Sequence, residues 1–396
     1  MAKYVVMNGN MAAAMGAKFC RPDVIAAYPI TPQTPIVEYL AQFIAEGELD
    51  AAFSEVESEH SAMSVIQGAA LAGGRTFTAT SSQGLALMYE PYFRTSTLRL
   101  PVVMAIVNRE MISPQTVWGG PQDSLTLRDA GWIQLYCEDN QEILDTIIQA
   151  YKIAENSEVL LPVNVCFDGF YLSHMAEKVE VPDQELVDEF LPPYYNCHIK
   201  LDPQEPISVD PLTPGSLLIE YRQKHMEAMQ RAVEVIKSVD IEFGKVFGRC
   251  YGGLVADYRL EDADYVIVTL GSMTGAAKEA VDLARDKGIA VGVLRVRALR
   301  PFPVDEIRKK LMGRRAVAVV DRNVSFGWGT GILYQEICSA LYGISSTPIP
   351  ILPYIGGLGG EDLTIDMFNK VIDDLKKAGP YSENITTRWL IRGESK

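Results

Sequence analysis

The sequence predicts an α/β protein, with a doubly wound parallel sheet in a first domain and a second, smaller α/β domain after it. From residue 20 to about 170, short β-branched runs alternate with amphipathic stretches, and the alternation resumes at residue 263. This pattern is typical of parallel strands joined by helices that cover both faces of a sheet. A chain of 396 residues, 48% of them hydrophobic and 22% charged, is long enough for two or three packed domains.

The first domain is expected at residues 1–250. Its strands are predicted at 24–30, 52–56, 75–80, 101–107 and 160–166. Its helices are predicted at 34–45, 58–72, 83–95 and 140–154. Prolines then crowd together between residues 176 and 215, which favours a linker or an extended arm, and one helix is predicted at 216–240. The arm and this helix, at about 176–240, are counted with the first domain.

The second domain is expected at residues 251–396. Its strands are predicted at 265–270, 289–296 and 316–320, and its helices at 276–287, 304–312, 331–342 and 364–378. A glycine-rich run at 356–360 has neither the lysine of a phosphate-binding loop nor the G-x-G-x-x-G spacing. A flexible turn is the better interpretation of that run.

Composition excludes several classes of function. The net charge of −15 is spread along the chain, which argues against a nucleic-acid partner. The chain has no run of eighteen apolar residues and its N-terminus lacks the pattern of a signal peptide, so we expect a cytoplasmic protein without membrane contact. The six cysteines include no C-x-x-C pair and the four histidines are scattered. We therefore expect buried reduced thiols, and neither an iron–sulfur cluster nor another metal on this chain.

Candidate functional residues follow the first-domain strands, because ligands of open parallel sheets bind outside the carboxyl ends of the strands. In the first such loop, Pro29, Ile30 and Pro32 surround Thr31. A stiff turn in which Thr31 or Thr34 caps the next helix is one explanation. A hydroxyl group at a helix N-terminus can also favour an anionic substrate group.

The second loop carries three carboxylates. Glu55 and Glu57 are explained as solvated acids at the start of a helix. Glu59 differs because a helix face of small residues follows it, and such a face lets another group approach closely. A carboxyl group in that setting can act on a ring nitrogen. The small residues are Ala62, Gly68, Ala69 and Ala70.

The third and fourth loops follow the next two predicted strands. Residues 80–84 are rich in hydroxyl groups and include Ser82 and Gln83, and capping alone could account for them. Arg109 directly follows an apolar strand that should be buried. Its planar guanidinium either pairs internally with Glu110 or Asp123, or holds a substrate carboxylate through two hydrogen bonds.

With these loops, the sequence resembles the alpha subunit of the 2-oxoacid:ferredoxin oxidoreductases, the family of pyruvate, 2-oxoisovalerate and oxalate oxidoreductases. The resemblance covers essentially the whole chain. It rests on the motifs Tyr28-Pro29-Ile30-Thr31-Pro32, Glu57-Ser58-Glu59-His60, Thr80-Ser81-Ser82-Gln83-Gly84, Val107-Asn108-Arg109, Arg128-Asp129-Ala130-Gly131-Trp132, Asp168-Gly169-Phe170 and Arg300-Pro301-Phe302-Pro303. It implies a first domain like the pyrimidine-binding domain of thiamine-diphosphate enzymes and a second like the transketolase C-terminal domain.

The resemblance also implies roles for single residues. Glu59 would hydrogen-bond N1′ of the cofactor's aminopyrimidine and favour its imino form. Thr31 and Arg109 would hold the oxo and carboxylate groups of a small 2-oxoacid. The residues implied to contact the cofactor are Glu59, Pro29, Ile30, Ser82 and Gln83.

The resemblance further implies an obligate heteromer, because this chain has no G-D-G motif for diphosphate and Mg²⁺ and no cysteine set for clusters. Thiamine diphosphate would be shared with a beta-type subunit that holds the diphosphate and Mg²⁺. Gamma- and delta-type ferredoxin-like subunits would carry 4Fe–4S clusters and pass electrons to ferredoxin.

The loop after Arg109 departs from the family pattern. The candidate substrate-loop residues are Gln115, Thr116, Trp118, Gly119 and Gly120, and the departures are polar Gln115 and Thr116 and the Gly119-Gly120 pair. Polar side chains and two glycines that could let the loop move make oxalate a contender beside a pyruvate-like substrate, whereas neutral drift would leave specificity unchanged. Two rival functions stay open: a thiamine enzyme without iron–sulfur partners, and a non-catalytic α/β scaffold subunit.

Overall fold

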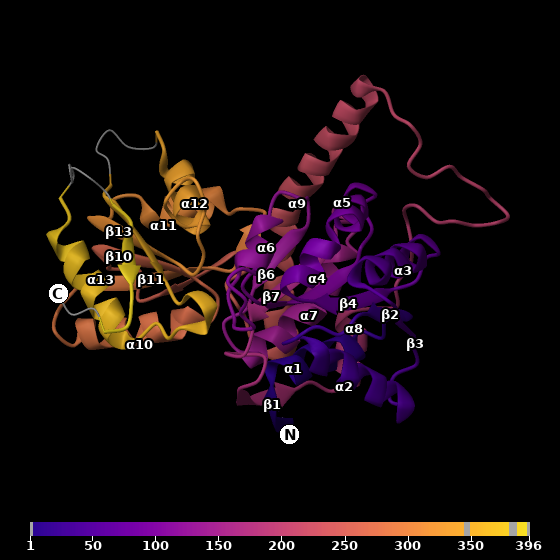
Figure 1. Ribbon diagram of the computed structural model, residues 1–396, viewed down its shortest axis with the longest axis horizontal. Helices are drawn as coiled ribbons and strands as arrows, with labels where there is room; N and C mark the ends of the chain where they lie inside the picture. Colours follow the sequence, from indigo (N-terminus) through magenta and orange to yellow (C-terminus); the bar gives the residue numbers. More distant parts are fainter. Residues whose placement is uncertain (1–2, 344–348, 380–385, 394–396) are drawn as a thin grey trace.

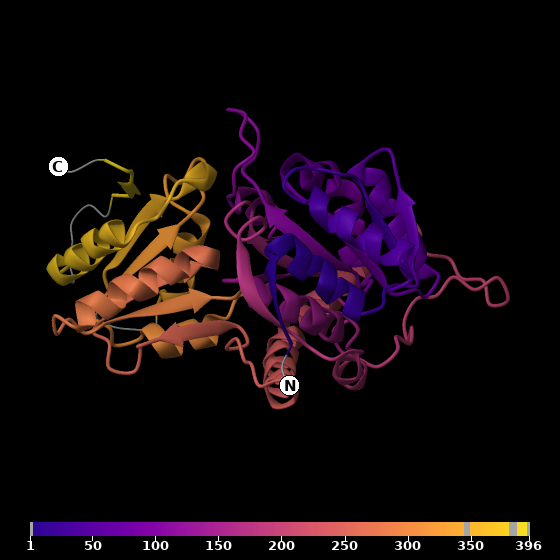
Figure 2. The ribbon, with the colours of Figure 1, turned by 90° about the horizontal axis from the view of Figure 1, so that it is seen from below.

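The structure is a computed structural model that describes residues 3–343, 349–379 and 386–393, and it shows two sheet-based domains side by side (Figure 1). Within these ranges, the first domain has a seven-stranded sheet in the order β12-β6-β7-β5-β4-β2-β3. The second has a six-stranded sheet in the order β15-β14-β13-β10-β11-β9. Helices cover both faces of each sheet (Figures 1 and 2). The predicted fold class is confirmed.

The first sheet is parallel except at one edge. Its strands are β2 (Val24–Ala27), β3 (Ala52–Glu55), β4 (Thr76–Thr80), β5 (Val103–Asn108), β6 (Ile133–Tyr136), β7 (Val163–Asp168) and β12 (Ala298–Arg300). Neighbours among β2 to β7 all pair in parallel, and β12 pairs antiparallel with β6. The carboxyl ends of β5, β4, β2 and β3 therefore meet at one edge of the sheet.

Three helices of the first domain agree closely with the predicted ranges, whereas the helices at 9–19, 122–126 and 184–190 were not predicted. The helices of this domain are α1 (Gly9–Phe19), α2 (Thr34–Ala45), α3 (Glu59–Leu71), α4 (Ser82–Leu87), α5 (Tyr89–Thr97), α6 (Gln122–Thr126), α7 (Asn140–Ala154), α8 (Gln184–Phe190) and α9 (Gly215–Phe247). The single helix predicted at 83–95 is two helices, α4 and α5, and α9 is longer than predicted at both ends. Helix α1 packs closely on α7, because a Cβ at Gly16 would lie 2.8 Å from the Leu144 carbonyl oxygen.

The proline-rich segment contains more structure than predicted. Strand β8 (Ala176–Val181) pairs antiparallel with the unpredicted strand β1 (Lys3–Asn8), and α8 follows it. Only the part between α8 and α9 is an extended loop, which projects from the domain together with the first half of α9 (Figure 1). The expectation of a linker or arm is therefore wrong for residues 176–190, where a distant N-terminal strand supplies the pairing partner.

The second domain has a mostly parallel sheet. Its strands are β9 (Val255–Tyr258), β10 (Tyr265–Leu270), β11 (Val291–Val296), β13 (Ala316–Asp321), β14 (Ile351–Gly356) and β15 (Arg388–Leu390). Its helices are α10 (Thr274–Arg285), α11 (Val304–Leu311), α12 (Ile332–Leu341) and α13 (Ile365–Lys377). Strand β9 runs antiparallel to β11, and the other neighbours are parallel.

A buried ion cluster joins the two domains. Glu142 on α7 accepts hydrogen bonds from Arg295 Nη1 at 2.6 Å and from Arg297 Nε at 2.9 Å, and all three side chains are buried. Burial alone would raise the pKa of Glu142, but the two arginines outweigh it and hold the pKa below its ordinary value. Since a buried charge is tolerated only when it is paired, this cluster fixes α7 against the end of β11.

No helix in the described ranges is both long and apolar enough to cross a membrane. Buried thiols are found at Cys20, Cys137 and Cys166, but Cys197 and Cys250 are exposed. The expectation of buried cysteines is therefore wrong for these last two, which lie in the loops that flank α9.

Candidate active site

Four neighbouring parallel strands bring the four candidate loops to one edge of the first sheet. Arg109 follows β5, Ser82 follows β4, Thr31 follows β2, and Glu59 follows β3. Because these strands are parallel and adjacent in space, their loops lie close together even though Thr31 and Arg109 are 78 residues apart in the sequence. Arg109 and Thr31 are in direct contact through a hydrogen bond.

Glu59 is a buried carboxylate at the start of α3. Ser58 caps the helix by accepting a hydrogen bond from Ser61 N at 3.2 Å. Glu59 is only 5% exposed, and its side chain makes no ion pair within the described ranges. Burial raises its pKa, while its own backbone amide opposes the shift. Glu57, in contrast, is exposed and accepts from Ser61 Oγ at 2.6 Å, as expected for a solvated acid.

Close approach to Glu59 comes from Gly84 rather than from the small residues of α3. A Cβ at Gly84 would lie 2.5 Å from Glu59 Oε1 and 2.6 Å from Thr80 Oγ1. Ala62 is instead buried in the core, and Gly68 faces open space. The hypothesis of a small helix face beside Glu59 is therefore wrong. In the sequence, the one indication of this contact with Glu59 was Gly84, the last residue of the motif at 80–84.

Arg109 is a buried cation whose side chain donates hydrogen bonds to carbonyl groups. Its guanidinium donates from Nη1 to the Thr31 oxygen at 2.9 Å and from Nε to the Thr116 oxygen at 3.0 Å, and the residue is 6% exposed. Among the described residues, neither Glu110 nor Asp123 forms an ion pair with it, so the internal pair is excluded. Burial lowers the pKa of Arg109, and nearby Asp123 opposes this effect. Because both hydrogen-bond acceptors are neutral carbonyl oxygens, the guanidinium charge is available to bind an anion.

The first loop is held by residues that sequence reasoning missed. Helix α2 has Gln33 at its cap position without a side-chain hydrogen bond, so neither Thr31 nor Thr34 caps it as predicted. Gln33 Oε1 instead accepts from Ile30 N at 3.3 Å, and Asn10 Nδ2 donates to the Pro32 oxygen at 2.9 Å. The exposed Thr31 hydroxyl has no hydrogen-bond partner among the described residues. It is free to meet a ligand.

The third loop offers Gln83 and Thr80 more readily than Ser82. The Ser82 hydroxyl already donates to the Glu110 carbonyl oxygen at 2.7 Å. Gln83 Oε1 and Thr80 Oγ1 are buried without a hydrogen-bond partner in the part of the chain that the structure describes. Since such atoms are costly to bury unpaired, they indicate a polar ligand beside Glu59.

The loop after Arg109 is a closed hairpin. Arg109 bridges to Gly119, and Glu110 N donates to the Trp118 oxygen at 3.1 Å. The Thr116 hydroxyl accepts from Trp118 N at 3.2 Å, which leaves exposed Gln115 as the more available polar side chain. Trp118 is 51% exposed and packs against Phe170, with 4.6 Å between the ring centroids and the rings tilted by 56°.

The two glycines of this hairpin serve close packing rather than movement. A Cβ at Gly119 would lie 2.3 Å from the Gly169 oxygen, and a Cβ at Gly120 would lie 2.2 Å from Glu110 Oε1. Both glycines are buried. The expectation that they let the loop move is therefore wrong.

Replacing Gly119 by alanine is expected to destabilise the protein by about 1–3 kcal/mol, because its new Cβ meets backbone that cannot move aside cheaply. Thermal or urea unfolding would measure the loss. Gly68→Ala is the matched control: its Cβ meets no atom within 4 Å, and alanine favours a helix by about 0.5–1 kcal/mol. Equal effects of the two substitutions would contradict the packing role.

The second domain completes the site from the other side. Gly360 N donates to the Gly119 oxygen at 2.9 Å, and Arg322 Nη1 lies 3.0 Å from Asp168 Oδ2 at the end of β7. Gly357 and Gly360 have φ values of 73° and 75°, a conformation that favours glycine. The glycine-rich run is therefore an ordered contact between the domains, not the flexible turn that was expected.

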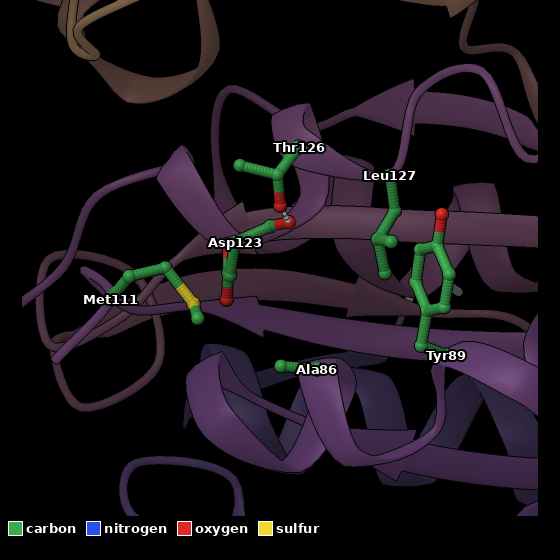
Figure 3. Close-up of a pocket in the computed structure, with 6 residues that line it drawn as sticks. All are labelled: Ala86, Tyr89, Met111, Asp123, Thr126 and Leu127. Atoms are coloured by element: carbon green, nitrogen blue, oxygen red, sulfur yellow. Dashed lines mark hydrogen bonds between the residues drawn. The ribbon is translucent and has the colours of Figure 1, made fainter. Parts of the chain in front are cut away.

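A pocket of about 190 Å³ lies beside these loops (Figure 3). Met111 and Asp123 face it from one side and Ala86 from α4, while Thr126 donates to the Asp123 carbonyl oxygen at 2.7 Å. The lining residues are Ala86, Tyr89, Met111, Asp123, Thr126 and Leu127. Burial raises the pKa of Asp123 to about 6 and that of neighbouring Glu110 to about 7. The pocket thus joins apolar walls to a buried carboxyl group.

Known protein families match both domains. Residues 15–240 match the family described as "Pyruvate flavodoxin/ferredoxin oxidoreductase, thiamine diP-bdg", and residues 263–368 match "Pyruvate:ferredoxin oxidoreductase core domain II". Together with the fold and the buried glutamate, these matches define the class: a protein of the thiamine-diphosphate-binding oxidoreductases.

Relatives cover nearly the whole chain. It is 49% identical to pyruvate synthase subunit PorA of Methanocaldococcus jannaschii over 98% of both chains. It is 50% identical to the alpha subunit of NADH-dependent phenylglyoxylate dehydrogenase of Aromatoleum evansii, over 94% of this chain and 91% of the other. It is 47% identical to ketoisovalerate oxidoreductase subunit VorA of Pyrococcus horikoshii, over 94% and 93%. The chain belongs to the alpha subunits of the 2-oxoacid:ferredoxin oxidoreductases, which confirms the resemblance.

Solved structures agree on the fold. A 2-oxoglutarate:ferredoxin oxidoreductase from Magnetococcus marinus aligns with a TM-score of 0.72 at 21% identity, over 94% of this chain and 65% of the other. A split-gene transketolase, an inactive beta4 tetramer, aligns with a TM-score of 0.55 at 15% identity, over 94% and 98%. The likeness to transketolase supports the expected two-domain architecture. Nothing in these matches supports oxalate as a substrate.

Proposed function

We propose that this chain binds the aminopyrimidine of thiamine diphosphate and the head group of a pyruvate-like 2-oxoacid, in an enzyme whose other subunits hold the rest of the cofactor and the electron carriers. The observation that carries this proposal is a buried Glu59 that forms no ion pair with any described residue, at the same sheet edge as a buried Arg109 whose guanidinium donates to two carbonyl oxygens. Arg109 and Thr31 are in contact, as two groups that bind one small substrate should be.

The residues around Glu59 fit the aminopyrimidine ring. Thr80 Oγ1 and Gln83 Oε1 are buried without partners among the described residues, and Gly84 leaves room for the Glu59 carboxylate. An aminopyrimidine presents ring nitrogens and an amino group that such atoms can satisfy. Pro29 and Ile30 lie on the adjacent loop, where we propose an apolar contact with the ring.

The proton chemistry assigned to Glu59 follows from its burial. A carboxyl group whose pKa is raised by desolvation can share a proton with a ring nitrogen near neutral pH. Glu59 would hold this proton at N1′. Bound thiamine diphosphate supplies the electron sink that a 2-oxoacid needs to lose carbon dioxide.

The substrate head group is assigned to Arg109 and Thr31. Arg109 would bind the carboxylate, and the unpaired Thr31 hydroxyl would donate to the 2-oxo group. Pyruvate, phenylglyoxylate and ketoisovalerate, the compounds in the names of the relatives, share this head group and differ in the tail. We therefore propose pyruvate as the reference substrate.

The partners are proposed from what this sequence lacks. Without a G-D-G motif, the diphosphate and Mg²⁺ are assigned to a beta-type subunit. Without a C-x-x-C pair, the 4Fe–4S clusters are assigned to gamma- and delta-type subunits that reduce ferredoxin. Subunit names such as PorA support a multi-subunit enzyme.

Purification of the native complex tests this division of labour. The complex is expected to contain thiamine diphosphate, to absorb near 400 nm through its clusters, and to reduce a viologen with pyruvate. The separated chain is expected to bind thiamine diphosphate with Mg²⁺ at least about tenfold more weakly, since it holds only one end of the cofactor. Tight Mg²⁺-dependent binding by the separated chain would contradict the shared site.

A substrate panel completes the test. Pyruvate, 2-oxoisovalerate, 2-oxoglutarate, phenylglyoxylate and oxalate are compared by kcat/KM. Turnover of any of these without cluster-bearing partners would favour the rival thiamine enzyme. A complex without thiamine diphosphate would favour the scaffold subunit.

A further inference from the structure

We propose that Asp123 is a positioning residue that aligns the Ser82 loop and the Arg109 loop for substrate binding. It would not touch the substrate, because its oxygens are occupied by groups of the protein itself. The inference rests on the proposed function in that the Arg109 loop is taken to bind the 2-oxoacid. Its geometry, however, stands independently of the substrate.

Asp123 accepts hydrogen bonds from two loops at once. Its Oδ2 accepts from Ser82 N at 2.9 Å and from Arg109 N at 3.1 Å. Its Oδ1 accepts from Asn108 Nδ2 at 2.8 Å and from Ser124 N at 2.7 Å. The residue is 1% exposed, so water cannot replace these contacts.

Asp123 reinforces a junction at which β4 and β5 no longer pair. Their last paired residues are Thr80 and Ile106. Two side-chain hydrogen bonds also cross this junction, from Ser82 Oγ to the Glu110 carbonyl oxygen at 2.7 Å and from Ser81 Oγ to the Val107 carbonyl oxygen. Ser82 has a φ of 46°, a left-handed conformation that costs a residue with a side chain about 1–2 kcal/mol. A carboxylate that accepts from Ser82 N offsets this cost and fixes the distance to Arg109 N.

Protonation would break the link. Burial raises the pKa of Asp123 to about 6 even though four donors oppose the shift. As pH falls through about 6, the carboxylate gains a proton, loses acceptor capacity and releases a backbone N–H that is then buried without a partner. Below this pH the Ser81 and Ser82 hydroxyl groups would still join the two loops, but their backbone alignment would loosen.

The other ionisable groups that face Asp123 are few. Glu110 faces it with a pKa of about 7, and Arg109 remains a cation. Burial raises the pKa of Tyr92 and Tyr136 above their ordinary range, and that of Cys166 well above it, so these three stay neutral near pH 6. Among the described residues that face Asp123, Glu110 is therefore the one that titrates at a nearby pH, and it loses its proton at the higher pH.

Asp240 provides a matched control. This buried aspartate on α9 organises the turn that follows the helix, since it accepts from Tyr251 N at 3.1 Å and from Gly253 N at 2.9 Å. Asp240→Asn therefore removes a buried carboxylate that also accepts from two backbone amides but does not join the Ser82 and Arg109 loops. Any loss that both variants share reports on stability alone.

The test compares Asp123→Asn, Asp240→Asn and the unmodified protein in the assembled complex. Asp123→Asn is expected to raise KM for pyruvate about tenfold, the equivalent of one lost hydrogen bond, and to remove the fall in kcat/KM near pH 6. Hydrogen exchange without substrate is expected to show faster exchange at Ser82 N and Arg109 N in this variant only. Asp240→Asn is expected to keep the unmodified KM and pH profile.

Three results would overturn the proposal. The first is equal kinetic and exchange behaviour of the two variants. The second is an Asp123→Asn variant with the unmodified KM and unchanged protection of both amides. The third result needs no variant, so it can be obtained even if Asp123→Asn fails to assemble. It is an unmodified complex in which hydrogen exchange at Ser82 N and Arg109 N follows only the intrinsic pH dependence of exchange between pH 5 and 7. Hydrogen exchange is measured without turnover, so it tests the role of Asp123 even if the proposed function of the chain is wrong.

Discussion

Glu59→Gln is expected to lower kcat of the assembled complex by about 10²–10⁴-fold, the usual contribution of a positioned proton-transfer group. Glutamine keeps the size of the side chain but cannot hold a proton at N1′. Glu59 is buried without an ion pair among the described residues, so no salt bridge is lost with its charge. Removing a buried carboxylate whose pKa is raised should not destabilise the fold. Steady-state kinetics and thermal unfolding measure the two effects separately.

Glu57→Gln is the matched control, two residues away on the same turn. Glu57 is exposed and accepts from Ser61 and from its own backbone amide, so its loss is expected to leave kcat within about twofold. Exchange of the cofactor C2 proton in the complex gives a second measurement. Unchanged exchange in Glu59→Gln, or equal kcat for both variants, would rule out the proton role.

Much of the fold could be predicted because its periodic signals are strong and local. Helices α2 and α7 and strand β10 begin and end at the predicted residues. Helix α7 shows why: Asp139 caps it by accepting from Glu142 N at 2.8 Å, and a continuous apolar pattern follows. Loop positions followed from the strands, so the candidate residues could be assigned to one edge of the sheet.

The remaining elements depend on contacts between segments far apart in the sequence. Strand β1 pairs with β8, some 170 residues later, and neither has the apolar alternation of a core strand. Strand β12, at residues 298–300, pairs with β6 in the sheet of the first domain. Sequence periodicity reports local structure, and it carries no information about such partners.

The candidate site shows the same division. The sequence indicated Glu59 and Arg109 as unusual, because each is a charged group at the end of an apolar strand or the start of a helix. It did not reveal that Gly84 makes room for Glu59, or that Asp123 accepts from Ser82 and Arg109 together. Those relations exist only once neighbouring strands are side by side. Both were therefore found from the structure.

Arg109→Ala is expected to lower kcat/KM for pyruvate by about 10²-fold or more, because two hydrogen bonds to a charged group contribute about 1.5–3 kcal/mol each. Most of the loss should appear in KM. The same factor is expected for 2-oxoisovalerate, since the proposed contact is to the carboxylate that both substrates share. Added guanidinium should restore part of the activity, because the cavity left by the side chain retains the Thr31 and Thr116 carbonyl groups.

Two further variants separate substrate binding from loop structure. Arg109→Lys keeps the charge without the planar fork and is expected to fall between the unmodified enzyme and Arg109→Ala. Arg94→Ala removes an exposed arginine paired with Asp210 and should leave kinetics unchanged, since exposed ion pairs contribute about 0–1 kcal/mol to stability. A KM for Arg109→Ala equal to that of Arg94→Ala would exclude carboxylate binding by Arg109. Its guanidinium would then serve only to hold the Thr31 and Thr116 carbonyls, and the substrate carboxylate would need a cation from a partner subunit.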